Sequence, residues 1–213
     1  GKVVRDAADA VGIVFKMEAI GDDVPANYPV ALQGKTIVGY AVAIENVATG
    51  RQTLNTELLT ALTETVAGMT NGTQTTGVLL TGLGDVAFKT TYEKWVGEHA
   101  SASENLSAWY IPTLSQLSAF MGTLFTMKDV PATGSEDFKN IPEFEFVNGK
   151  MFDRETIATV NYASSTINNQ GNVSGVRINV ADGVVTNAQE AGISVKTALN
   201  QQALCRPMIT IFK

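Results

Sequence analysis

The nucleophiles and bases of this sequence are few, which limits the chemistry that it can carry out. His99 is the only histidine and Cys205 is the only cysteine. A Ser–His–Asp or Cys–His site needs an imidazole beside its nucleophile. His99 lies in a polar stretch, residues 97–101, which predicts a solvated surface side chain. A single cysteine near a strand-like C-terminus is typical of a small buried hydrophobe. We therefore expect no catalytic site and no enzyme.

Adjacent carboxylates occur at Asp22-Asp23 and at Glu136-Asp137, and carboxylate oxygens are ligands that calcium prefers. Neither pair has the periodic oxygen spacing of a calcium loop, and His and Cys do not cluster as zinc ligands do. The glycine-rich run 81–85 lacks the lysine of a phosphate-binding loop and is better explained as a turn before a helix. We expect neither a metal nor a cofactor.

Side-chain amides gather late in the chain, between residues 161 and 187. Amides both donate and accept hydrogen bonds, which suits sugar hydroxyls or an adaptable protein interface. Asparagine also favours turns, and this second interpretation stays open. The candidate ligand-binding residues are Asn161, Asn168, Asn169, Asn172, Arg177, Asn179 and Asn187.

Charge and hydropathy exclude two classes of partner. The net charge is −6 and lysine and arginine form no cluster, so we expect neither nucleic acid nor an anionic membrane as a partner. The sequence contains no run of about 18 apolar residues, so it predicts no membrane-spanning helix. Charged residues make up only 17%, and the short neutral polar residues that replace them suit an extracellular bacterial protein. The chain begins Gly1-Lys2 without a methionine, which is the appearance that we expect after removal of a leader, a lipoprotein segment or a tag.

In the first half of the chain, hydrophobic patterns predict strands over residues 12–17 and 36–46. Apolar residues at helical spacing over 53–66 predict a helix. Residues 68–84 contain five glycines and many threonines, which predicts a loop or short strand. A second helix follows Asp85 as N-cap, with Tyr92 and Trp95 on its packing face.

In the second half, Thr113 or Ser115 can cap a helix whose apolar face includes Leu117 and Phe120. Strand patterns follow at 143–147, 156–164 and 176–180, the last leading through Asp182-Gly183 into a hairpin, and a final strand covers 205–212. The pattern indicates an α+β architecture in one domain, residues 1–213, with 53–84 as a possible insertion.

Several of these segments, in this order, resemble the C-type-lectin-like and formylglycine-generating-enzyme-like domains of gut Bacteroidetes surface lipoproteins and fimbria-associated proteins. The matching segments are Gly12-Ile13-Val14-Phe15, Ala41-Val42-Ala43-Ile44, Ala108-Trp109-Tyr110-Ile111-Pro112, Gln116-Leu117-Ser118-Ala119-Phe120, Tyr162-Ala163-Ser164-Ser165-Thr166, Asp182-Gly183 and residues 205–212. The chain departs from the family pattern at Gln116, Ala163 and Ile167, where the family usually has Glu, Trp and an acidic residue.

The resemblance implies a C-type-lectin-like fold with mixed and antiparallel sheets, two main helices, and paired N- and C-terminal strands. It implies a surface location, lipid-anchored or secreted. It also implies a non-enzymatic, adhesin-like domain that binds a glycan or a protein. The alternative is a structural subunit of a fimbrial or outer-membrane assembly without a small-molecule ligand.

Overall fold

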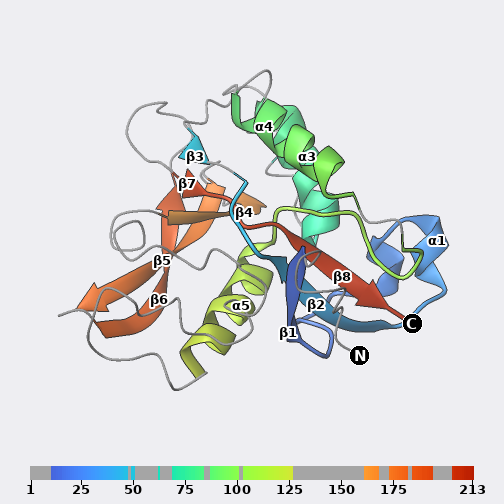
Figure 1. Cartoon of the computed structure of the whole chain (residues 1–213), viewed down its shortest axis with the longest axis horizontal. Coiled ribbons are helices and arrows are strands. Elements are labelled where there is room, and N and C mark those ends of the chain that lie inside the picture. Colours follow the sequence, from blue (N-terminus) through green and yellow to red (C-terminus); the bar gives the residue numbers. More distant parts are fainter. Residues whose placement is uncertain are drawn as a thin grey trace.

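The chain folds as a mixed α+β protein, as the computed structural model in Figure 1 shows. The structure describes residues 11–47, 49–50, 62, 69–83, 87–100, 103–126, 161–167, 173–181, 184–193 and 203–213. The expected α+β class is confirmed. We expected two main helices, but the described residues form three long helices, each of twelve or thirteen residues. These are α3 (Gly72–Leu83), α4 (Ala87–Glu98) and α5 (Leu114–Thr126).

The first sheet has three strands, β1 (Gly12–Lys16), β2 (Ile37–Ala43) and β8 (Met208–Phe212), in the order β1-β2-β8. Both outer strands are antiparallel to β2. The prediction that the first and last strands pair with each other was wrong, because β2 lies between them. β2 is apolar on both faces and six of its seven residues are buried, which suits the central strand of a covered sheet.

The far edge of β8 is occupied as well. The extended segment around Leu106 and Tyr110 forms bridges to Ile211 and Met208, and the backbones of Tyr110 and Met208 exchange two hydrogen bonds of 2.9 Å. Pro207 comes directly before β8, where its missing N–H costs the ladder nothing.

Two short elements connect β1 to β2, the 3-10 helix η2 (Pro25–Asn27) and α1 (Val30–Gln33). Their core contribution comes from Tyr28 and Leu32, which pack with Phe212 and Ile37. Phe15 of β1 packs against the same cluster, so β1 and β8 share one hydrophobic cluster although they do not pair.

The second sheet has the order β3-β7-β4-β5-β6. Its strands are β3 (Thr49–Gly50), β7 (Ala203–Leu204), β4 (Asn161–Ile167), β5 (Val173–Ala181) and β6 (Val184–Ile193). β4 and β7 are parallel and the other pairs are antiparallel. The predicted hairpin is confirmed, since Ala181 pairs with Val184 and leaves two residues for the turn.

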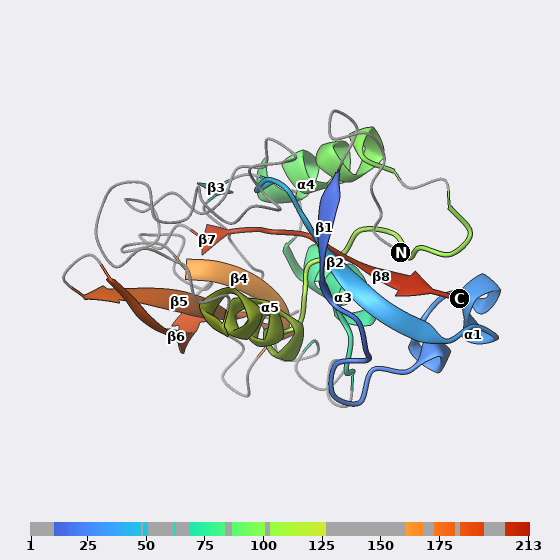
Figure 2. The same ribbon diagram turned by 60° about the horizontal axis from the view of Figure 1, so that its bottom comes forward.

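The helix α5 begins where the sequence predicts. The Thr113 hydroxyl accepts the Gln116 backbone N–H at 3.3 Å, and the Gln116 side-chain oxygen accepts the Thr113 N–H at 3.0 Å. This reciprocal pair is a capping box, which satisfies two donors that a helix start otherwise leaves free. α5 lies against β1 as well as β4, β5 and β6, so it packs between the two sheets (Figures 1 and 2).

The prediction of a loop or short strand over 68–84 was wrong, because residues 72–83 form α3. Glycine and threonine disfavour a helix only weakly, and tertiary packing overrides that preference. Leu79 and Leu83 provide the packing, in a cluster with Phe88 and Tyr92 of α4 and Val173 of β5. The predicted helix after Asp85 is confirmed as α4.

Two predicted elements fall on residues that the structure does not describe: the helix over 53–66 and the strand over 143–147. Within the first of them only Leu62 is described, and it is helical. The strand expected over 156–164 is observed as β4 from Asn161 onward. In the described part of the chain, no helix has the length and apolar character to cross a membrane.

Candidate functional site

Four of the seven predicted site residues lie on three neighbouring strands of the second sheet. Asn161 begins β4, Arg177 and Asn179 lie in β5, and Asn187 lies in β6. Asn179 pairs directly with Asn187 across the hairpin ladder. The chain fold therefore brings these residues together although up to 26 positions separate them in sequence, 187 minus 161.

The pairing register places three of them on the free part of the hairpin. β4 pairs with β5 only from Val173 to Val176, whereas β6 pairs with β5 over the whole of β5. Among the described strands, Arg177 to Ala181 therefore pair with β6 alone. Figures 1 and 2 show this half of the hairpin projecting away from the body of the molecule.

The remaining candidates, Asn168, Asn169 and Asn172, lie outside the described residues, in the connection between β4 and β5. Gln189, which the sequence analysis did not single out, pairs with Arg177. The sequence could have indicated Gln189, because alternate residues of a strand share one face of the sheet and Gln189 lies two residues from Asn187.

A second polar cluster lies in the interior, around Asp23, which is 3% exposed. One carboxylate oxygen, Oδ2, accepts the Tyr28 hydroxyl at 2.5 Å and the Tyr40 hydroxyl at 2.7 Å. The other, Oδ1, accepts the Asn71 side-chain amide at 3.0 Å. Burial raises the pKa of the Asp23 carboxyl, and these hydrogen bonds oppose that shift.

From Tyr28 a line of hydroxyl groups runs on through the core. Its hydroxyl lies 2.8 Å from the Thr210 hydroxyl of β8, which lies 2.8 Å from the Tyr110 hydroxyl. The Gln116 side-chain nitrogen then donates to the Tyr110 oxygen at 3.2 Å. All four side chains are buried, so these polar groups satisfy one another away from water.

The line closes into a ring at the start of α3. The Gln116 oxygen accepts the Gly72 N–H at 3.0 Å. The neighbouring Asn71 caps α3 by accepting the Gln74 N–H at 2.9 Å, and its amide nitrogen faces Asp23. We call these residues the Asp23 ring: Asp23, Tyr28, Thr210, Tyr110, Gln116 and Asn71 with Gly72.

The Asp23 ring is a structural feature of the interior. Because both carboxylate oxygens of Asp23 accept protein donors, the notion that Asp22 and Asp23 together offer oxygens to calcium does not fit this geometry. The described residues contain no group of three or more His, Cys, Asp or Glu placed to hold a metal ion.

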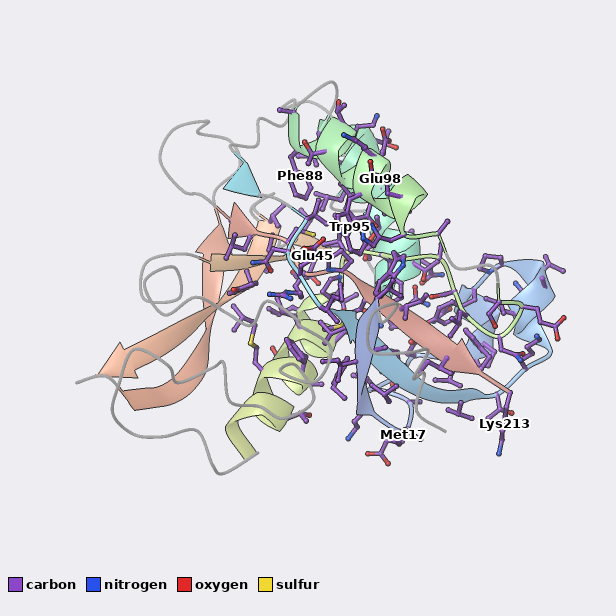
Figure 3. The ribbon with its side chains drawn as sticks, in the orientation of Figure 1. Met17, Glu45, Phe88, Trp95, Glu98 and Lys213 are labelled. Carbon is purple, nitrogen blue, oxygen red and sulfur yellow. The ribbon has the colours of Figure 1, made fainter. Side chains whose placement is uncertain are left out.

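His99 is not the solvated side chain that its polar neighbours predict. Its ring stacks on Trp95 with centroids 4.1 Å apart, and Nδ1 lies 2.8 Å from the Trp95 carbonyl oxygen at the end of α4. Nε2 lies 4.0 Å from Glu45, which follows β2 near Trp95 (Figure 3). The His99 side chain is 26% exposed. Its backbone carbonyl accepts the Trp109 indole N–H at 2.7 Å, which links the end of α4 to the extended segment before α5.

Cys205 and Arg206 lie in the connection from β7 to β8, and both are buried. Burial raises the pKa of the Cys205 thiol to about 12, which keeps it protonated and poorly nucleophilic. Burial lowers the pKa of the Arg206 guanidinium to about 10, and that group donates to the Ala43 carbonyl at 3.1 Å. The expected burial of Cys205 and of Trp95 is confirmed, and Trp109 and Tyr110 are buried as well.

Comparisons with protein-family models, with curated proteins and with solved structures returned no match. The candidate site therefore stands on the geometry of this chain alone.

Proposed function

We propose that this chain is a non-enzymatic, adhesin-like binding domain whose ligand, a glycan or a protein, is recognised by the free half of the β5–β6 hairpin. The supporting observation is the division of polar residues between interior and hairpin. Asp23, His99, Cys205 and Arg206 are engaged in packing and internal hydrogen bonds. Arg177, Asn179 and Asn187 lie instead on strands that project from the body.

The resemblance to C-type-lectin-like domains of surface lipoproteins supports the same proposal and adds the location, an exported protein at the outer-membrane surface or outside the cell. Amide and guanidinium groups on neighbouring strands can form paired hydrogen bonds with hydroxyl or main-chain groups. The strand ladder fixes the backbone spacing of these residues, which lowers the entropic cost of binding.

The experiment is a glycan array, run with and without calcium, followed by pull-down from host and bacterial surfaces. Reproducible binding to a defined glycan, lost when Asn179 and Asn187 are both replaced by Ala, supports a lectin. A blank array with a protein captured through the same residues supports a protein ligand. Binding that both substitutions leave intact contradicts the hairpin as the site.

One observation favours the alternative function, a structural subunit of a surface assembly. β6 is an edge strand of ten residues, so among the described strands its outer main-chain groups have no strand partner. Such an edge is a template for pairing with another chain. Oligomers that grow with concentration in sedimentation, with no ligand in either screen, would support the structural role.

A further inference from the structure

Asparagine followed by glycine is the dipeptide most prone to deamidation, because glycine has no side chain to hinder attack of its backbone nitrogen on the asparagine side chain. This sequence contains two such pairs, Asn71-Gly72 and Asn148-Gly149. The second pair lies outside the described residues. The first pair lies at the start of α3, where it belongs to the Asp23 ring.

The fold requires both residues of the first pair. Asn71 caps α3 through its side-chain oxygen, which accepts the Gln74 N–H at 2.9 Å, and its amide nitrogen donates to Asp23 at 3.0 Å. At Gly72 any larger residue would overlap the Tyr110 ring. The packing therefore retains a dipeptide that is chemically labile.

Deamidation of this pair is a ring closure followed by hydrolysis. The Gly72 nitrogen loses its proton to hydroxide and bonds to the side-chain carbon Cγ of Asn71, and the amide group takes a proton from water and leaves as ammonia. Water then opens the succinimide ring at one of its two carbonyl groups. One opening leaves an aspartate at position 71. The other leaves an isoaspartate, whose main chain runs through the former side chain and is one carbon longer.

The closed structure opposes each part of the ring closure. The Gly72 N–H is buried and donates to the Gln116 side-chain oxygen at 3.0 Å, so hydroxide does not reach its proton. The Asn71 side chain is 0% exposed and is held by hydrogen bonds at its oxygen and at its nitrogen. The reaction therefore needs the start of α3 to open, and its rate is limited by the fraction of chains that are open.

We propose that Asn71-Gly72 is a deamidation site that the folded chain protects and the unfolded chain exposes, and that deamidation there prevents the start of α3 from closing again at neutral pH. In the aspartate product, a carboxylate at position 71 faces the Asp23 carboxylate where an amide donated before. Two buried carboxylates at this distance repel each other, and neither supplies a donor unless one is protonated. In the isoaspartate product, the longer main chain displaces the Gly72 N–H from Gln116.

Loss of the helix cap is not the cause of the damage. An aspartate accepts the Gln74 N–H as an asparagine does, and its charge is favourable at the start of a helix. The cost comes from the contact with Asp23, whose other carboxylate oxygen is already engaged by Tyr28 and Tyr40. Time spent unfolded therefore lowers the share of chains that can refold, because each deamidated chain carries this repulsion permanently.

The effect of pH on the aspartate product follows from its carboxylate pair. Among the described residues, the titratable groups that face this pair are Tyr28 and Tyr40, and burial raises the pKa of both, so they stay neutral. The closed carboxylate pair binds one proton more tightly than the separated carboxylates of the unfolded chain do. By linkage, the stability that this proton provides is present at acid pH and is lost as the pH rises.

The first test compares two samples of the purified chain at pH 8, one folded and one unfolded in guanidinium chloride, by peptide mass spectrometry. Asn148-Gly149 reports the rate of the unprotected reaction in the denaturant, and we expect Asn71 to react at a similar rate there. In the folded sample, Asn71 should react at least about tenfold more slowly than in the denaturant. Equal rates at Asn71 in the two samples would overturn the proposed protection.

The second test builds the product directly. Asn71→Asp should lower the melting temperature by roughly 5–10 °C at pH 8 and by less at pH 5. Adding Asp23→Asn reverses the contact, because the amide at position 23 then donates to the carboxylate at position 71 while its oxygen still accepts from the two tyrosines. The double variant should recover most of the loss, also if Asn71→Asp alone fails to fold. A double variant no more stable than Asn71→Asp, or an Asn71→Asp variant as stable as the wild type, contradicts the proposal.

Discussion

At the scale of single residues, the side chains with chemical reactivity are used as interior supports. Asp23 accepts three hydrogen bonds, His99 stacks on Trp95, and the pKa of Cys205 is raised to about 12. The polar groups of Asp23 and His99 are matched by partners, which is the condition for burying them without a large penalty. The residue chemistry therefore supports a scaffold.

The thiol of Cys205 provides a direct check of this view. We expect no labelling by a maleimide at pH 7 to 8 in the folded chain, because the side chain is 0% exposed and remains a thiol at that pH. Labelling should become complete in strong denaturant. Rapid labelling of the native chain would show that the interior around Cys205 is open.

Replacing Gln116 by Ala should destabilise the chain by about 2–4 kcal/mol, because the Gly72 and Thr113 N–H groups and the Tyr110 hydroxyl lose a buried partner. Urea denaturation measures the loss. Ser118 lies on the same helix but is exposed, so Ser118→Ala is the matched control and should change stability by less than about 0.5 kcal/mol. Equal effects at both positions would contradict the interior role of Gln116.

At the scale of elements, some structure could be predicted from local pattern and some could not. The strands β1, β2 and β8 and the helix α5 follow hydrophobic periodicity, and Thr113 with Gln116 carries a readable capping signal. α3 was missed because its glycines and threonines give little local preference for a helix. Its stability comes from Leu79 and Leu83 in the core and from the Asn71 cap.

The start of α3 is also a close contact that only glycine permits. A Cβ atom at Gly72 would overlap the Tyr110 ring and the Ile111 carbonyl oxygen, whereas a Cβ at Gly77 would meet nothing within 4 Å. Gly72→Ala should therefore cost about 1–3 kcal/mol through overpacking. Gly77→Ala, in the interior of the same helix, should be neutral or stabilise by roughly 0.5–1 kcal/mol. In thermal denaturation, Gly72→Ala should lower the melting temperature, whereas Gly77→Ala should leave it unchanged or raise it.

At the scale of the whole molecule, the order of the strands in the sheets could not be predicted from the sequence. Nothing local to β1 or β8 says that both pair with β2, because pairing depends on partners far apart in the chain. The candidate residues Asn161, Arg177, Asn179 and Asn187 were found from composition, and the register then placed them on neighbouring strands. The Asp23 ring had no local signal, since its members span residues 23 to 210.

The two sheets share α5, and the core clusters join α4 to both sheets and α3 to the second one. We therefore expect one cooperative unfolding transition for the domain, followed by calorimetry and by circular dichroism in parallel. Addition of a chelator should leave the melting temperature unchanged. Two resolved transitions, or a large drop in melting temperature with the chelator, would contradict a single metal-free domain.

The central claim, that the projecting hairpin is the binding surface, is tested most directly by comparing ligand binding of three chains. These are the wild type, an Arg177→Ala/Asn179→Ala variant, and the control Lys94→Ala, which removes an exposed charge on α4. Once a glycan or protein ligand is found, we expect about a tenfold or greater loss of affinity for the hairpin variant and none for the control. Equal affinity of all three chains would place the binding surface elsewhere.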